Sequence, residues 1–187
     1  MTKIDVARRQ LVSAIRLLFE GGDLVSIYTL GANAWEVIDA LCTKESVESA
    51  SKQTRENIPS QSCLKRDYIN SPYRNFFKHA DKDYDTKLPE IPEHQVDAVL
   101  FLAVEDYLRL TQKAPLELQV FQLWYLAINT EKVAGDALEM ILESIESTFP
   151  NIRSLPRQQR LWMARMALAN AALDHDLLDD SRTEPAA

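Results

Sequence analysis

The residues best suited to chemistry lie in one short segment, residues 71–81, which reads Ser-Pro-Tyr-Arg-Asn-Phe-Phe-Lys-His-Ala-Asp. Histidine is the side chain that gains and loses a proton near neutral pH, so His79 could act as a general acid or base. Asn75 precedes it by four residues, a spacing that places two side chains next to each other on a helix. An amide in that position could orient the imidazole. Lys78 and Lys82 add positive charge that could bind a phosphate.

A short amphipathic helix is expected to carry these groups. Ser71 can cap a helix, and Pro72 suits the first helical position. At about 100° per residue, positions 75, 78, 79 and 82 form one polar face. The opposite face is apolar and consists of Tyr73, Phe76, Phe77 and Ala80. Aspartates follow at positions 81, 83 and 85, where negative charge opposes the helix dipole, so the helix should end near Lys82.

Arg74 is a further group that could bind an anion. It lies five residues before His79 and projects about 140° away from it on an ideal helix. Only the length of its side chain, or a distorted first turn, would bring both groups to one ligand. Between Lys65 and Lys87 the chain carries six Lys and Arg against four Asp. This positive stretch in an acidic protein predicts a modest preference for anions.

The spacing Arg74-Asn75-x-x-x-His79, on a helix of an all-α protein, resembles the motif of the HEPN superfamily. Many HEPN proteins are metal-independent endoribonucleases, often bacterial toxins, that act as dimers with the two motifs facing each other. The resemblance therefore implies a homodimer that cuts RNA without a cofactor. His79 would act as general base or acid at the ribose 2′-hydroxyl, Arg74 would steady the phosphate, and Asn75 would orient His79.

The string from Asn75 to Asp81 also resembles a family of small uncharacterised bacterial helical proteins. Two further elements carry this resemblance, Ala7-Arg8-Arg9-Gln10-Leu11 with the sequence that follows to Phe19, and Ala34-Trp35-Glu36. It covers roughly the first 130 residues. In that family the Asn-to-Asp string is the recognisable part and the Arg position is not, so this resemblance implies no catalytic role for Arg74.

Other interpretations of the same residues stay open. Asn75 and His79 could instead hydrogen-bond the backbone of a neighbouring loop, and the protein would then be a non-catalytic helical dimer or interaction module. A ligand sensor would need a closed pocket lined by Tyr73, Trp124 or Tyr125. We expect no metal site, because His79 and the aspartates after it lack a second well-spaced His. The sequence also shows no Gly-rich phosphate loop, no Gly-x-Ser-x-Gly, no His-Glu-x-x-His and no DNA-binding motif.

The elements that must position these groups are helices. With 4 Gly in 187 residues, no hairpin signal and no sustained alternation, the sequence offers little support for a sheet. We expect an all-α, mostly antiparallel multi-helix bundle, with a single domain over residues 1–180 and a frayed acidic tail over 181–187. Residues 44–59 predict a long polar loop. Helical periodicity predicts helices over residues 2–20, 26–41, 93–112, 115–128, 131–149 and 157–178.

The three tryptophans, Trp35, Trp124 and Trp162, lie within apolar patterns of these helices and are expected in the core or at a subunit interface. Composition narrows the class further. The net charge of −7 is uneven, since residues 1–92 carry 13 Lys and Arg and 13 Asp and Glu, whereas residues 93–187 carry 8 and 15. An anionic ligand should therefore prefer the first half. With no export signal, no apolar run that could span a membrane and two unpaired cysteines, we expect a cytoplasmic protein.

Overall fold

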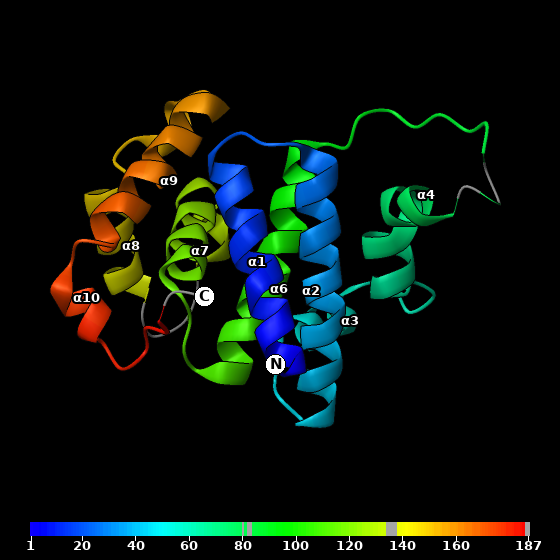
Figure 1. Cartoon of the computed structure of the whole chain (residues 1–187), viewed down its shortest axis with the longest axis horizontal. Coiled ribbons are helices and arrows are strands. Elements are labelled where there is room, and N and C mark those ends of the chain that lie inside the picture. Colours follow the sequence, from blue (N-terminus) through cyan, green and yellow to red (C-terminus); the bar gives the residue numbers. More distant parts are fainter. Residues whose placement is uncertain (80, 82–83, 134–137, 186–187) are drawn as a thin grey trace.

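The computed structural model describes residues 1–79, 81, 84–133 and 138–185, and these residues form an all-α multi-helix bundle (Figure 1), as the sequence predicts. The first half contains α1 (Lys3–Phe19), α2 (Leu24–Lys44), α3 (Ala50–Asn57), the π-helix η1 (Leu64–Arg74) and α4 (Asn75–Lys78). The second half contains α6 (Glu93–Thr111), α7 (Leu116–Ile128), the 3-10 turn η2 (Thr130–Lys132), α8 (Leu138–Thr148), the 3-10 turn η3 (Ile152–Ser154), α9 (Arg157–Ala171) and α10 (His175–Asp179).

Three long helices form the centre of the molecule. Helix α2 packs closely against both α1 and α6. Helices α7 to α10 lie on one side of this centre, and α3, η1 and α4 lie on the other (Figure 1). Neighbouring helices α1 and α2 run antiparallel, but α2 and α6 run in the same direction, because the chain crosses α3, η1 and α4 and returns over residues 84–92 to the end where α2 began (Figure 1).

The contact between α2 and α6 depends on a glycine in the middle of α2. Gly31 is buried, and a Cβ atom at this position would lie 2.7 Å from Cδ2 of Leu100 on α6. Leu100 is itself fully buried, so its side chain has little room to move aside. The glycine therefore sets how closely the two helices approach.

Residues 44–59 differ from the predicted polar loop, because they contain the helix α3. The side chain of Ser49 caps this helix by accepting a hydrogen bond from the Lys52 amide at 3.0 Å. In the same first turn Ser51 is fully buried, and its hydroxyl donates to Asp106 Oδ2 at 2.5 Å and accepts from Trp35 Nε1 at 2.8 Å. A polar contact thus docks α3 on the core, which is why its sequence carries few apolar residues.

The sequence predicts a frayed tail over residues 181–187, but hydrogen bonds hold Arg182–Glu184 on the bundle, and residues 186–187 lie outside the described part. The Ala114 amide donates to the Arg182 carbonyl at 2.9 Å, and the Glu184 amide donates to the Ala114 carbonyl at 3.0 Å. The Glu184 carboxylate accepts from the Tyr107 hydroxyl at 2.8 Å and pairs with Arg8 at 3.2 Å. Backbone and side-chain bonds therefore hold the tail on α1 and α6.

Two helix boundaries in the second half also differ from expectation. The predicted helix over 131–149 corresponds to η2 and the shorter α8, with residues 134–137 outside the described part. The predicted helix over 157–178 is divided into α9 and α10, because the Asp174 side chain accepts from the amides of Asp176 and Leu177 and so starts a new helix. None of the helices in the described ranges is long and apolar enough to cross a membrane.

The buried Asp106 predicts a specific pH dependence of stability. Burial raises the pKa of the Asp106 carboxyl above its ordinary value of 3.8, and the hydrogen bonds from Ser51 offset this only in part. The folded protein therefore keeps a proton that the unfolded chain loses. The resulting stabilisation is complete below pH 3.8 and is lost as the pH rises through the raised pKa of the folded state.

Asp106→Asn removes this titration and keeps an acceptor for Ser51. We expect the free energy of unfolding of the variant, measured by urea denaturation, to improve relative to wild type as the pH rises from about 4 to 7. A difference between the two proteins that stays constant over this range would contradict the prediction.

Candidate functional site

The segment proposed from the sequence for chemistry lies where two helical pieces meet. Ser71 has extended backbone angles, φ −98° and ψ 139°, and helical geometry resumes after it into α4. The predicted start at Ser71-Pro72 therefore corresponds to a real break in the helix, although η1 already precedes it. Helix α4 ends at Lys78, and its C-cap His79 has φ −126° and ψ 55°. The end expected near Lys82 lies outside the described residues.

The aromatic residues of this segment anchor it as their spacing predicts. Tyr73 is buried, and its ring lies 6.5 Å from that of Tyr28 on α2. Phe77 lies 6.4 Å from Tyr28 and 6.3 Å from Tyr73, measured between ring centroids. The Tyr28 hydroxyl donates to the Ile69 carbonyl at 2.8 Å, and burial raises its pKa to about 12. These contacts fix the end of η1 and the start of α4 on α2.

Arg74 points into the protein and is only 6% exposed. Its guanidinium donates to Asn70 Oδ1 at 2.9 Å and to Asn33 Oδ1 at 2.8 Å, and it pairs with Glu36 at 2.5 Å. Two of these partners belong to α2 and one to η1. Arg74 therefore joins η1 to α2 through Nη1 and Nη2, while its buried Nε has no hydrogen-bond partner in the described part of the chain.

Asn75, Lys78 and His79 share the short turn of α4, with Asn75 and Lys78 exposed and His79 partly exposed. The His79 amide donates to the Asn75 carbonyl at 3.1 Å. Within the described part of the chain, the side chains of Asn75 and His79 make no hydrogen bond. Lys82 lies outside the described residues. The structure thus brings Asn75, Lys78 and His79 together on the surface and separates Arg74 from them.

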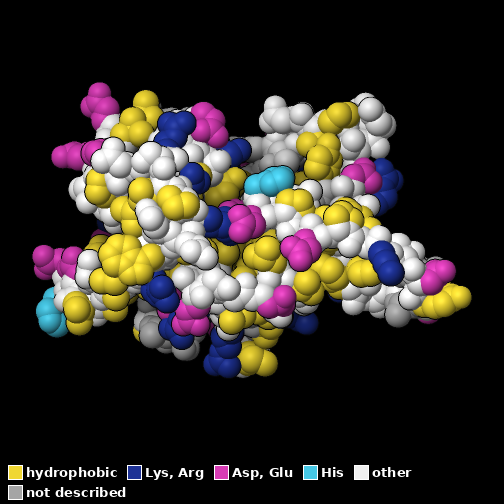
Figure 2. All heavy atoms as spheres, turned by 90° about the horizontal axis from the view of Figure 1, so that it is seen from above, with side chains coloured by type: hydrophobic (Ala, Val, Ile, Leu, Met, Phe, Trp, Pro, Cys, Tyr) yellow, Lys and Arg dark blue, Asp and Glu magenta, His cyan; other side chains and the backbone are white. Residues whose placement is uncertain are grey.

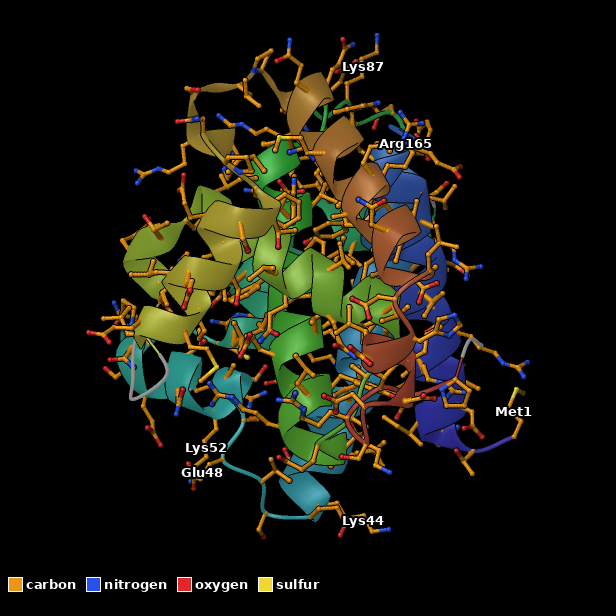
Figure 3. The ribbon with its side chains drawn as sticks, turned by 90° about the vertical axis from the view of Figure 1, so that its left-hand side faces the viewer. Met1, Lys44, Glu48, Lys52, Lys87 and Arg165 are labelled. Atoms are coloured by element: carbon orange, nitrogen blue, oxygen red, sulfur yellow. The ribbon has the colours of Figure 1, made fainter. Side chains whose placement is uncertain are left out.

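Acidic residues of α2 offset the positive charge of this half of the molecule. Lys65 pairs with Glu36, which also binds Arg74. Arg55 pairs with Asp39 at 2.5 Å, and Lys52 with Glu48, beside which it lies in Figure 3. Acidic side chains of α2 therefore neutralise part of the net positive charge counted over residues 65–87.

Lys78 has no carboxylate partner in the described ranges. Partial burial lowers its pKa most, the positive charge of Arg74 lowers it further, and Glu36 opposes the shift. The charge of Lys78 itself therefore remains next to His79. Among the residues that the structure describes, no three His, Cys, Asp or Glu side chains are placed to hold a metal ion.

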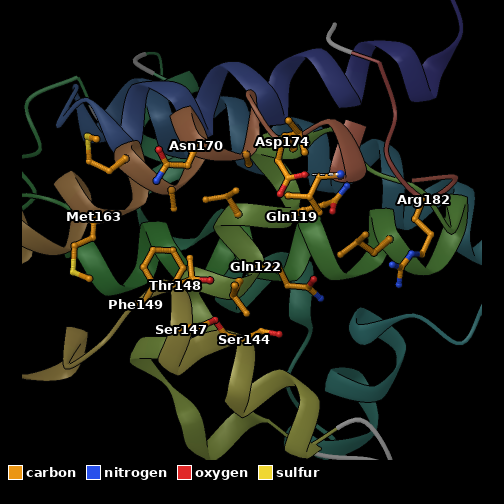
Figure 4. Close-up of a pocket in the computed structure, with 18 of the residues that line it drawn as sticks. Gln119, Gln122, Ser144, Ser147, Thr148, Phe149, Met163, Asn170, Asp174 and Arg182 are labelled. Carbon is orange, nitrogen blue, oxygen red and sulfur yellow. Dashed lines mark hydrogen bonds between the residues drawn. The ribbon is translucent and has the colours of Figure 1, made fainter. Parts of the chain in front are cut away.

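An apolar groove lies on the opposite side of the molecule. Helices α8 and α9 both pack on α7 but make few contacts with each other (Figure 3). The groove between them has a volume of about 980 Å³. Its floor is α7, with Gln119 and Gln122 visible in Figure 4 between Ser144 of α8 and Asn170 of α9. Its apolar lining includes Leu116, Val120, Leu123, Phe149, Trp162, Met163, Met166 and Ala167.

Some large apolar side chains of this groove are exposed. Of the twelve that are exposed in the described part of the chain, Trp162, Met166 and Leu177 line the groove. Trp162 is 55% exposed and Met166 is 42% exposed, whereas Trp35 and Trp124 are fully buried. The sequence indicates an exposed apolar face on α9. Trp162, Met163 and Met166 form a second apolar stripe, beside the core-facing stripe that contains Leu161 and Ala164.

A second, smaller pocket of about 320 Å³ is lined by Tyr125, one of the residues considered for a ligand sensor. The charged side chains of this pocket form ion pairs with one another. Arg157 binds both oxygens of Asp97, at 2.7 and 2.9 Å, and also pairs with Glu93 at 3.1 Å. Burial and the nearby Asp97 raise the pKa of Tyr125 to about 12. The internal ion pairs leave little unsatisfied charge in this pocket to recognise a ligand.

No protein-family model, no curated protein and no solved structure matches this chain. Functional inferences therefore rest on the geometry of its own residues. That geometry provides two candidate sites, the exposed turn with His79 and the apolar groove on α7.

Arg74 and His79 should behave differently when replaced. Arg74→Ala leaves the oxygens of Glu36, Asn33 and Asn70 without their partner, so we expect a loss of about 2 kcal/mol in the free energy of unfolding. His79→Ala removes a partly exposed side chain without a hydrogen bond in the described chain, so its effect should stay within about 0.5 kcal/mol. Urea denaturation of both variants measures these differences. Equal effects of the two substitutions would show that Arg74 does not join η1 to α2.

Proposed function

We propose that this protein is a non-catalytic interaction module that binds an amphipathic helix of a partner in the groove between α8 and α9. One observation carries the proposal, the exposure of Trp162 and Met166 along an apolar groove. Exposed single apolar residues are common, but a contiguous patch within a groove is typical of binding surfaces. Helix-in-groove recognition uses this kind of surface.

The side chains of the groove suit such a role. Tryptophan is enriched among the residues that contribute most to binding energy, because it covers a large area with few rotatable bonds. Met163 and Met166 add unbranched, flexible side chains that can adapt to the shape of a bound partner. Polar residues at the edges, such as Gln119 and Asn170, can hydrogen-bond a partner at the rim.

An amphipathic peptide tests the proposal directly. We expect an 18-residue helical peptide with Leu at positions i, i+3, i+4 and i+7 to bind the full-length protein, as measured by anisotropy of a label on the peptide. Trp162→Ala should weaken this binding about tenfold or more, because it removes the most exposed aromatic group of the groove. Acrylamide quenching of wild-type fluorescence should fall on binding, since Trp35 and Trp124 are already buried.

Tyr68→Ala is the matched control. Tyr68 is 48% exposed but belongs to η1, on the other side of the molecule, so its removal should leave the affinity unchanged. A peptide that does not bind wild type, or that binds both variants equally well, would exclude the groove as the docking surface.

A second candidate function is a metal-independent ribonuclease that acts as a homodimer, with His79 as general acid or base. The observation that favours it is the exposed turn on which Asn75, Lys78 and His79 are fixed by Phe77 and the aromatic rings of Tyr73 and Tyr28. The ammonium group of Lys78, which has no carboxylate partner in the described ranges, would attract a phosphate to this turn. Arg74 would serve there by positioning the turn on α2, since its Nη1 and Nη2 donors bind Asn33, Asn70 and Glu36.

Under this second candidate, wild-type protein should degrade total RNA in the presence of a chelator, and His79→Ala should not. His94→Ala is the control, because His94 is exposed at the start of α6 and lies outside the turn, so it should cleave like wild type. Intact RNA with wild type and His79→Ala alike, on gels after prolonged incubation, would rule out this function.

A further inference from the structure

We infer that the segment between α9 and the docked tail closes over a helix bound in the groove and buries its exposed leucines on that helix, an inference that rests on the proposed interaction function. We call this segment, residues 172–181 with α10, the strap. The residues directly before and after it, Ala171 and Arg182, both line the groove, and so does Asp174 within it. Asp174 and Arg182 lie toward the end of the groove that is farther from Met163 (Figure 4). The strap therefore borders one end of the groove.

Both ends of the strap are fixed on the bundle. At its start, Ala171 is the last residue of α9 and is buried. At its end, the backbone of the tail forms a bridge with Ala114, and the Gln119 side chain on α7 donates to Thr183 Oγ1 at 3.0 Å. Gln119 is itself part of the groove. The strap is therefore attached to the groove at both of its ends.

The middle of the strap is held by local bonds. Within the described part of the chain, the hydrogen bonds of residues 173–179 join positions at most four residues apart, such as those from the amides of Asp176 and Leu177 to Asp174 Oδ1. In the same described ranges, no residue of α10 forms an ion pair, and α10 makes few contacts with the other helices. Helix α10 can therefore move relative to α7 and α9 without breaking a hydrogen bond to another part of the bundle.

The strap carries apolar side chains that are exposed to water. Leu173 is 79% exposed, Leu177 is 38% exposed and Leu178 is 44% exposed. Leu177 belongs to the described lining of the groove, and Leu173 and Leu178 lie outside it. Burial of apolar surface is favourable in proportion to its area, so these side chains favour any position of the strap in which they are covered.

A helix bound in the groove would supply the surface that covers them. The strap does not cover the groove by itself, because Trp162 and Met166 of the neighbouring helix α9 stay 55% and 42% exposed. An amphipathic helix on α7 would fill the space between α9 and the strap and would bring apolar side chains to the leucines. Closure of the strap on this helix buries apolar surface at little loss of existing contacts.

Hydrogen exchange of the full-length protein tests the movement, with the amphipathic peptide of the proposed function as the probe. The amides of Leu177 and Leu178 should exchange fast in the free protein and about tenfold or more slowly with bound peptide, because closure orders the strap. The Glu184 amide, which donates to the Ala114 carbonyl, should be protected in both states. Mass spectrometry of proteolytic fragments measures both regions in one experiment.

A matched pair of double variants locates the contact. Leu173→Ser with Leu178→Ser changes the two leucines outside the groove lining, so it affects binding only if the strap moves. We expect the labelled peptide to dissociate about tenfold faster from this variant, with a similar association rate, since the strap closes after the helix has bound. Val25→Ser with Tyr68→Ser is the control, because these side chains are 43% and 48% exposed on α2 and η1 and should leave both rates unchanged.

The outcomes separate the two proposals. Peptide binding with unchanged exchange of α10, or with equal dissociation rates for the two double variants, overturns the strap and leaves the interaction function standing. Tighter binding by the variant of Leu173 and Leu178 would show that the strap competes with the peptide, and it also overturns the inference. Failure of the peptide to bind wild type overturns both proposals.

Discussion

The structure of the second half of the chain depends on one constraint, the apolar surface that surrounds α7 on almost every side. Phe121 and Trp124 are fully buried, and Leu123 and Val120 are partly covered on other faces of the same helix. A helix that is apolar all round must be covered all round. Helices α1, α6, α8 and α9 each pack on it, and Glu117 at its start pairs with Arg16 of α1 at 2.5 Å. The groove is the part of this surface that the chain leaves uncovered.

Hydrophobic periodicity predicted the long helices well, because their burial depends on apolar stripes. Helix α1 has the capping arrangement of Thr2 and Asp5 that its sequence indicates, and Tyr73 and Phe77 anchor their segment as their spacing suggests. Periodicity could not find α3, since its docking residue is Ser51 bound to Asp106, a contact between positions that are 55 residues apart. The direction of Arg74 was equally hidden, because Asn33 and Glu36 lie about forty residues away on another helix.

The charge distribution is likewise predicted only in part from the sequence, because ion pairs join residues that are distant along the chain. Counting residues along the chain identifies a positive stretch near His79 and an acidic second half. In the structure Glu36 and Asp39 of α2 reach the cations of the first half, so the stretch is partly neutralised. The carboxylates of α8 and α10 meet no such partners in the described residues, so their charge persists. The sequence could therefore indicate the sign of the net charge of the second half, but not which of its carboxylates have cationic partners.

The contacts of the C-terminal tail affect how the protein unfolds. Glu184 binds Arg8 across 176 positions of sequence and also binds Tyr107, so the two extremities of the described chain are fastened to each other through the middle helices. Local unfolding of either extremity breaks the ion pair between Arg8 and Glu184, so each extremity helps to keep the other folded. Partial opening that begins at a terminus, the usual route by which proteases enter a helical protein, is thereby disfavoured, and the bundle should lose its structure as one cooperative unit.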